Sequence, residues 1–278
     1  MWKPLWPLLS DVVCVSAALA DFTGTTLYVG RKTHPALGVL HVLGYQNTAV
    51  NLAAGPNAML LHLPAVGLTA GNLVSVGRDV GFLDRIGSAC EPLSAGGGIA
   101  AMSAAVDVQV FEHDIYTMVL APDATVLPSA LHQVPPRKRP HLDPELLAFY
   151  SDHYPRHSMS LCCFDNAEAQ RAKPLLLWYS PTEPDLLVAP ALDCHTGGVP
   201  SFDVPVQADH RVAFGTDAAG PDWGYPIDYS PGMRRKLRQF LPDAVIGDVF
   251  HGLLPNGDFA ITHDDVLAEN FDGVHRLS

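Results

Sequence analysis

The sequence predicts a strand-rich α+β fold with a few short helices at its periphery. Three observations support this prediction. Glycine and proline account for 23 and 24 of the 278 residues, which favours many short elements joined by turns. Short apolar runs typical of strands outnumber the patterns typical of helices. Finally, two segments of the chain repeat the same order of strand, polar connection and strand.

The two similar segments are Val39–Pro64 and Met159–Pro181. Each begins with an apolar run and continues through an aromatic residue, any residue and an asparagine, which are Tyr45–Asn47 in one segment and Phe164–Asn166 in the other. Each then passes through an alanine-rich polar stretch into a second apolar run. This order predicts an internal duplication with a pseudo-twofold arrangement. The alternative, two unrelated strand pairs in a β-rich fold, stays open.

The predicted domain organisation is one compact unit made of two halves. We expect the first half over residues 21–134, a connector over 135–140 and the second half over 141–278. The connector falls in the run VPPRKRP, whose three basic residues between prolines predict an exposed, extended segment. Residues 1–20 are interpreted either as a leader or as a buried N-terminal arm. Their apolar run faintly resembles a secretory signal, but two prolines and an aspartate interrupt it.

Three short helices are expected. Asp143 before Pro144 is an N-cap followed by proline at the first helical position, so a helix begins there and ends before Pro155. A second helix follows Ser230 and Pro231 and carries apolar residues at helical spacing as far as Leu241. A third covers Val80–Ala89.

Strands are predicted over most of the remaining apolar runs. Those beyond the two similar segments are Thr26–Val29, Val106–Val110, Ile115–Leu120, Leu186–Leu192, Arg211–Phe214, Val249–Leu253 and Phe259–Ile261. The dipeptide Asn256-Gly257 lies between the last two runs, and Asn-Gly between apolar runs indicates a hairpin turn.

Charge and cysteine content exclude several classes of partner. The formal net charge is −12, which disfavours binding to the phosphate backbone of nucleic acids. No stretch approaches the roughly 20 apolar residues that a membrane-spanning helix needs. The five cysteines form no CxxC pair, which indicates free thiols in a reducing compartment. We therefore expect a soluble, cytoplasmic protein that binds neither nucleic acid nor membrane.

The strongest candidate for a catalytic site is the run ALDCHTGG at 191–198. It follows a predicted strand, which fixes side chains, and ends in two glycines, which let a ligand approach. Asp193 and His195 share one face of the strand and could pair, whereas Cys194 points to the other face. With His210 they form the predicted catalytic set, for hydrolysis or acyl transfer. The alternative is structural, with Cys194 as a small buried residue and His195 capping a turn.

Two further patches are candidates for ligand binding. Trp223 and Tyr225 lie in a loop rich in glycine and proline, where aromatic rings either line a ligand site or close the edge of the core. Arg234 and Arg235 belong to the basic face of the second predicted helix. That face either binds an anionic ligand or is simply solvated.

No motif fixes a cofactor or a reaction. The sequence lacks GxGxxG after a strand, GxxxxGK[ST] and GxSxG, and the glycines at 96–98 are interpreted as a loop. No cofactor and no metal is predicted. Three functions remain open: an enzyme acting on a small molecule or peptide, a non-enzymatic binding or assembly module that forms homo-oligomers, and a metalloenzyme using His195, His210 and an aspartate.

Overall fold

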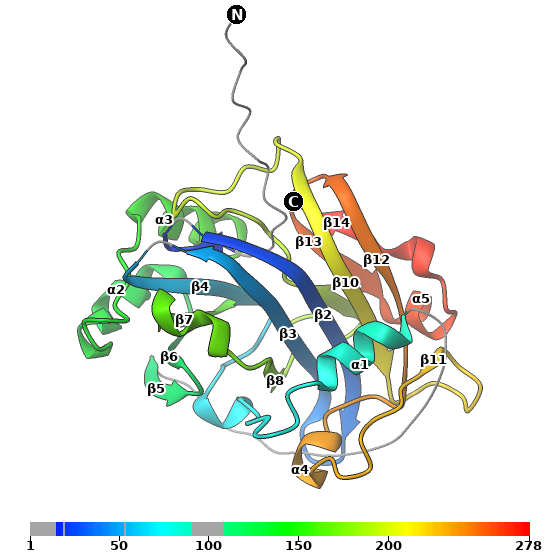
Figure 1. The fold of residues 1–278 in the computed structure, drawn as a ribbon. Coiled ribbons are helices and arrows are strands. Elements are labelled where there is room, and N and C mark those ends of the chain that lie inside the picture. Colours follow the sequence, from blue (N-terminus) through cyan, green and yellow to red (C-terminus); the bar gives the residue numbers. More distant parts are fainter. Residues whose placement is uncertain (1–14, 19, 53, 91–107) are drawn as a thin grey trace, which may run out of the picture.

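The structure is a computed structural model that describes residues 15–18, 20–52, 54–90 and 108–278. Within those ranges the strands form three sheets, and short helices lie around them (Figure 1). The predicted α+β, strand-rich fold with a few short helices is therefore confirmed.

The sheets contain five, six and three strands in the described part of the chain. Sheet 1 has the order β1 (Val15–Ser16), β4 (Pro56–Leu63), β7 (Ser158–Asp165), β6 (Tyr116–Ala121) and β5 (Gln109–His113). Sheet 2 has the order β11 (Tyr225–Pro226), β12 (Ala244–Leu254), β10 (Val206–Thr216), β2 (Ala20–His34), β3 (Gly38–Leu52) and β8 (Leu175–Tyr179). Sheet 3 has the order β14 (His275–Leu277), β13 (Asp258–Thr262) and β9 (Leu186–Ala189). Sheets 1 and 2 each combine strands from both sides of the predicted connector.

The helices are short. The α-helices are α1 (Phe82–Ala89), α2 (Leu127–Ala130), α3 (Pro144–His153), α4 (Arg235–Arg238) and α5 (His263–Leu267). The 3₁₀ helices are η1 (Ala70–Asn72), η2 (Ala124–Val126), η3 (Leu131–Gln133), η4 (Asn166–Arg171) and η5 (Phe271–Gly273).

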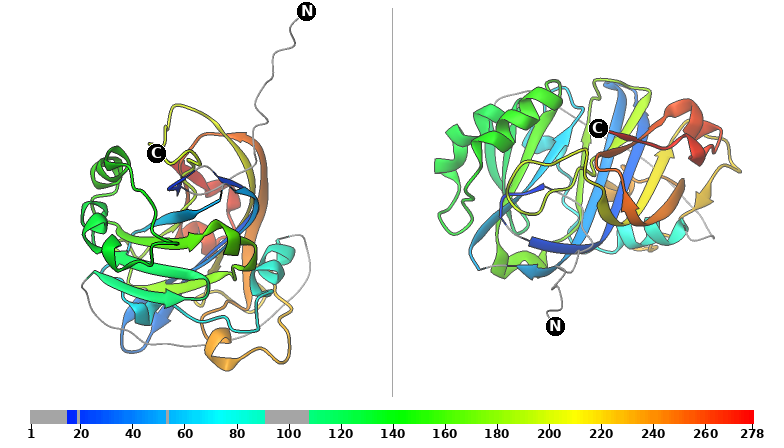
Figure 2. Two further views of the ribbon diagram at one scale, coloured as in Figure 1. Left: turned by 60° about the vertical axis from the view of Figure 1, so that its left-hand side comes forward. Right: turned by 90° about the horizontal axis from the view of Figure 1, so that it is seen from above.

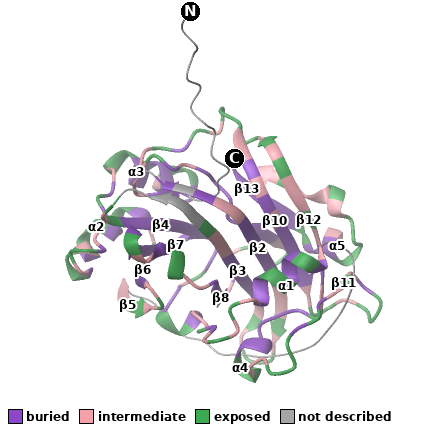
Figure 3. Cartoon of the chain, viewed as in Figure 1, coloured by how far each residue is buried: buried purple, intermediate pink, exposed green. Residues whose placement is uncertain are grey.

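The core is layered because the central strands are buried on both faces. In β2, Leu27 and Val29 face the core between the sheets, whereas Tyr28 faces the core beneath α1. A third core lies between sheet 1 and α3 (Figure 2). Strands buried on both faces need near-continuous apolar runs, which is the pattern that made them recognisable in the sequence. Figure 3 shows that the exposed residues gather on the loops and on the outer sides of the helices.

Two adjacent thiols on β7 illustrate the layering. Cys162 points into the core between the sheets, and Cys163 points into the core beneath α3, since successive residues of a strand face opposite ways. Burial raises the pKa of Cys162 to about 12. Within the described part of the chain, these two thiols, Cys90 and Cys194 form no disulfide with one another.

Two of the three predicted helices are confirmed. Helix α3 has Asp143 as its N-cap, whose carboxylate accepts a hydrogen bond from the backbone N–H of Glu145 at 2.9 Å. Helix α1 lies inside the range expected for the third helix. The prediction of a longer second helix is wrong, because only Arg235–Arg238 is α-helical there. Arg234 just before it has extended backbone, and its guanidinium binds Asp79 at 2.9 Å.

The predicted hairpin at Asn256-Gly257 is also wrong. Strands β12 and β13 flank the dipeptide, yet β12 belongs to sheet 2 and β13 to sheet 3. The Asn256 side chain accepts a hydrogen bond from the backbone N–H of Asp193 at 2.9 Å and donates to the carbonyl of Ser201 at 3.0 Å. The dipeptide therefore connects the chain to a distant loop instead of folding β12 back onto β13.

The two similar segments form β3–β4 and β7–β8, and they pair with each other. Strand β3 pairs antiparallel with β8, and β4 pairs antiparallel with β7. The asparagines are not equivalent, because Asn47 lies inside β3 and Asn166 begins η4. The duplication and its pseudo-twofold arrangement stay predictions.

The segments expected to flank the two halves, the N-terminal arm and the connector, both contain residues that pack against the rest of the fold. Within the range expected to be a leader or arm, β1 pairs with β4, and Val15 is buried. In the expected connector the chain forms turns, and Lys138 is 4% exposed. Its ammonium binds Glu112 at 2.9 Å, so this part of the connector is not the exposed, extended segment that its composition suggests.

Candidate functional site

The loop after β9 brings Asp193 and His195 together as expected from their shared face. Asp193 Oδ1 lies 3.1 Å from His195 Nε2, and both side chains are buried. Burial raises the pKa of Asp193 to about 8, against the lowering effect of the Arg276 charge. The carboxyl is therefore largely protonated at neutral pH, and in that form it can donate a hydrogen bond to His195 Nε2.

Cys194 lies apart from this pair. Its Sγ is 3.3 Å from Thr196 Oγ1 and 3.4 Å from the carbonyl oxygen of Gly198. The alternation of side chains that separates it from His195 in the sequence is preserved in the structure. These contacts do not form a thiolate–imidazole pair of the kind that activates a cysteine nucleophile.

His210 lies on β10 and is 1% exposed. Its ring meets the edge of Phe259 at a centroid distance of 5.5 Å, and neither ring nitrogen has a hydrogen-bond partner among the described residues. Burial lowers the pKa of His210 to about 3, and the nearby charges of Arg276 and His251 lower it further. The ring is therefore neutral at physiological pH, and a group of such low basicity is a weak general base there.

Sequence reasoning missed the residue that organises this region, Asp258. One of its oxygens lies 2.6 Å from His62 Nε2, and the other accepts the backbone N–H groups of Ala191 and Leu192 at 2.8 and 3.0 Å. Burial alone would raise the pKa of Asp258, but the His62 ring and the two N–H groups hold it below its ordinary value. This carboxylate joins sheets 1 and 3 and fixes the start of the loop that carries Asp193.

Arg276 of β14 completes the group. Its guanidinium lies over the Phe259 ring at 4.0 Å. Burial lowers the pKa of Arg276 to about 10, against the opposing charges of Asp258 and Asp193. The Arg276 charge thus acts on both Asp193 and His210, two of the catalytic residues predicted from sequence. We call the set the Asp258 cluster; its members are His62, Asp193, His195, His210, Asp258 and Arg276.

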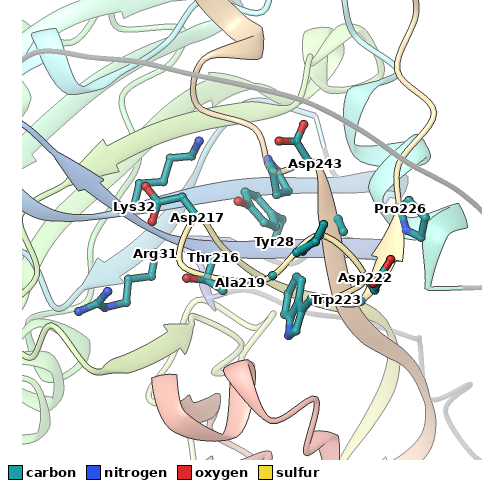
Figure 4. Close-up of a pocket in the computed structure, with 15 residues that line it drawn as sticks. Tyr28, Arg31, Lys32, Thr216, Asp217, Ala219, Asp222, Trp223, Pro226 and Asp243 are labelled. Atoms are coloured by element: carbon teal, nitrogen blue, oxygen red, sulfur yellow. The ribbon is translucent and has the colours of Figure 1, made fainter.

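A separate cavity of about 570 Å³ opens between β2, the loop from β10 to β11 and the start of β12 (Figure 4). Trp223 lines it and is only 9% exposed, and its indole N–H donates to the carbonyl of Val266 at 2.8 Å. Trp223 therefore fits both interpretations of its loop, since it closes the edge of the core and also forms a wall. We call this cavity the Trp223 pocket. Its polar lining residues include Arg31, Lys32, Asp217 and Asp222.

The other predicted ligand residues lie outside the pocket lining. Tyr225 is 42% exposed and pairs with Val245. Arg234 is held by Asp79, and Arg235 is exposed on α4. A ligand-binding role for Tyr225, Arg234 and Arg235 stays a prediction.

The metal hypothesis finds no matching geometry in the described ranges. No group of three or more histidine, cysteine, aspartate or glutamate side chains there could hold a metal ion, and this covers His195 and His210. The glycine run at 96–98 lies outside the described residues. Among the helices of the described chain, none is both long enough and apolar enough to cross a membrane.

Comparison with known proteins gives similarity in structure only. No protein-family model and no curated protein matches the sequence. Solved structures similar to it include baculovirus P35, with 11% identity and a TM-score of 0.44 over 91% of this chain and 92% of that one. The caspase-8/P35 complex matches with 10% identity and a TM-score of 0.44 over 88% of this chain and 89% of that one. Similarity at this level identifies neither a shared function nor an equivalent residue.

Proposed function

We propose that the protein is a binding protein whose ligand, a small molecule or a short peptide, occupies the Trp223 pocket. The observation that carries this proposal is the pocket itself. Its volume of about 570 Å³ falls within the range of roughly 300–1,000 Å³ that ligand sites usually have. Aromatic walls combined with a few charged groups are also typical of such sites.

A screen of small molecules and short peptides by ligand-observed NMR tests the proposal. Ala219 lines the pocket, so an Ala219→Trp variant fills it. We expect the wild-type protein to bind at least one class of compound and Ala219→Trp to lose that binding. Val66→Trp is the matched control, because Val66 is 64% exposed and is not among the lining residues. Binding that survives in Ala219→Trp would overturn the proposal.

Hydrolysis or acyl transfer at Asp193 and His195 is the second candidate. The contact of 3.1 Å between the two side chains favours it, because a carboxyl group commonly orients a catalytic imidazole. Their burial and the position of Cys194 argue against it, so a nucleophile would have to come from water or from the substrate.

The second candidate is tested by assaying the wild type and His195→Ala on ester and peptide substrates. Activity that His195→Ala abolishes while ligand binding persists would favour catalysis at this pair. Activity that is unchanged in His195→Ala, or absent from the wild type, would remove the second candidate.

A further inference from the structure

Some charged side chains that line the Trp223 pocket already form hydrogen bonds and ion pairs with other residues of the protein. Arg31 donates to Asp185 at 2.9 Å and to the carbonyl of Pro184 at 2.9 Å. Asp243 accepts from the Arg238 guanidinium at 2.6 Å. Each of these two lining charges therefore already faces an opposite charge within the protein.

Lys32 and Asp222 are less committed. The ammonium of Lys32 makes one long hydrogen bond among the described residues, 3.4 Å to the carbonyl of Gln239. Asp222 is exposed, and no described residue forms a hydrogen bond or an ion pair with it. Figure 4 shows Lys32 and Asp222 on opposite sides of the pocket, with the rings of Tyr28 and Trp223 between them. The pocket thus offers a weakly bonded cation and an exposed anion separated by aromatic surface. The Asp217 carboxylate, which accepts the Thr33 N–H at 2.8 Å, also lines the pocket and lies on the Lys32 side (Figure 4).

The floor of the pocket at the Lys32 end depends on two glycines. Gly30 of β2 and Gly215 of β10 are register partners, and the Tyr28 ring lies across them. A Cβ at Gly30 would meet the Tyr28 oxygen, so any larger residue there would displace the ring. Burial raises the pKa of Tyr28, which keeps the phenol neutral, and its oxygen has no hydrogen-bond partner among the described residues.

We infer that the ligand carries separated charges, with a carboxylate at Lys32 and an ammonium at Asp222, which is the chemistry of a short peptide with free ends. This inference rests on the proposed function and names the ligand class. A singly charged carboxylate suits the Lys32 end better than a phosphate does. The nearby Asp217 and Asp243 carboxylates lie close enough to act on Lys32, and they would repel a doubly charged anion more strongly.

The inference is tested by isothermal titration calorimetry, in which the full chain is titrated with three forms of one tripeptide, Ala-Leu-Ala. The forms are the peptide with free ends, its C-terminal amide and its N-acetylated acid. We expect the amide to bind about tenfold to a hundredfold more weakly than the free peptide, as loss of a charge-assisted hydrogen bond in a partly buried site predicts. The N-acetylated form should bind about two- to fivefold more weakly, because Asp222 is exposed.

Matched variants assign each effect to its residue. Lys32→Gln should bind the acid and the amide equally, and Asp222→Asn should bind the free and acetylated peptides equally. Lys236→Gln removes an exposed charge on α4 outside the pocket lining and should preserve both preferences.

The outcomes separate this inference from the proposed function. Equal binding of acid and amide by the wild type, or a preference that survives in Lys32→Gln, would overturn the assignment of the carboxylate. A preference for the free amine that survives in Asp222→Asn would overturn the assignment of the ammonium. If no tripeptide form binds but another compound does, and Ala219→Trp abolishes its binding, the inference fails while the proposed function stands. If nothing bound by the wild type depends on the pocket, both fail.

Discussion

The Asp258 cluster and the Trp223 pocket both bring together charged side chains from distant parts of the chain. They differ in how far those side chains are buried and in how many hydrogen bonds they make within the protein. In the cluster, Asp258 is fully buried and accepts hydrogen bonds from a histidine and two backbone N–H groups. In the pocket, Asp222 is exposed and has no partner among the described residues. A buried, fully bonded charge holds the fold together, whereas an accessible and uncommitted charge is available to a ligand.

The largest expected effect is the loss of stability in Asp258→Ala. The substitution leaves the His62 ring and two backbone N–H groups without their acceptor in a buried site. Breaking a buried pair in this way costs about 3–5 kcal/mol, which urea denaturation followed by circular dichroism can measure. Asp248→Ala is the control, because Asp248 is exposed and among the described residues its carboxylate accepts a hydrogen bond only from the N–H of the next residue. A loss similar to that of the control would mean that Asp258 does not hold the sheets together.

The next largest effect is on the stability of the protein at acidic pH. His210 has a folded pKa of about 3, below the 6.5 of an unfolded histidine, so the unfolded chain binds the proton more readily. Its stabilising contribution is therefore present above pH 6.5 and is lost as the pH falls below that value. A histidine of this kind lowers the unfolding free energy by up to about 1.4 kcal/mol for each unit by which the pH falls in this window. His210→Asn should make the fall in unfolding free energy between pH 6 and pH 4 shallower by about this amount per unit.

The His210 experiment needs a comparison with an accessible histidine. His141 is exposed and is not among the groups whose charges act on His210, so the difference between the wild type and His210→Asn should be the same in a His141→Asn background. Parallel curves for the wild type and His210→Asn would show that His210 can be protonated in the folded protein without penalty.

A smaller effect separates the two aspartates of the cluster. Asp193 has a folded pKa of about 8, above its unfolded value, so ionisation of the unfolded chain destabilises the fold as the pH rises from about 4 towards 8. Asp193→Asn removes this penalty, so across the single unit from pH 5 to pH 6 its unfolding free energy should fall less than that of the wild type, by up to about 1.4 kcal/mol. A loss of stability at pH 8 would show that Asp193 is ionised and paired like Asp258.

The smallest effect is expected in the pocket. Asp222→Asn should change the unfolding free energy by less than about 0.5 kcal/mol, because the residue is exposed and makes no contact that the fold uses. Denaturant titration at neutral pH measures it. A large loss would place Asp222 with the structural charges and would weaken the contrast between the two regions.

Local patterns in the sequence identified much of the fold. The cap at Asp143 and Pro144 indicated α3, and the alternation along ALDCHTGG correctly placed Asp193 with His195 and Cys194 apart from them. Each of these predictions depends on residues within a few positions of one another. The failure at Asn256-Gly257 is the opposite case, because the turn depends on hydrogen bonds to residues more than fifty positions away.

The sites themselves depend on pairings between distant segments. His62 and Asp258 lie 196 positions apart, and nothing near either residue indicates that they meet. The Trp223 loop was recognisable from its composition. Lys32 and Tyr28 were not, because they reach the pocket through the parallel pairing of β2 with β10. The register between such strands is set by packing of the whole molecule, so it leaves no short-range signal.

The neighbouring thiols of β7 have a practical consequence. Cys162 belongs to the core between the sheets and Cys163 to the core beneath α3. Two consecutive residues therefore report on two different parts of the core. A thiol reagent reaches either sulfur only when the layer above it opens. The labelling rate of Cys162 would therefore report how often the sheets separate, and that of Cys163 how often α3 moves away from sheet 1. Both rates can be measured in the same protein.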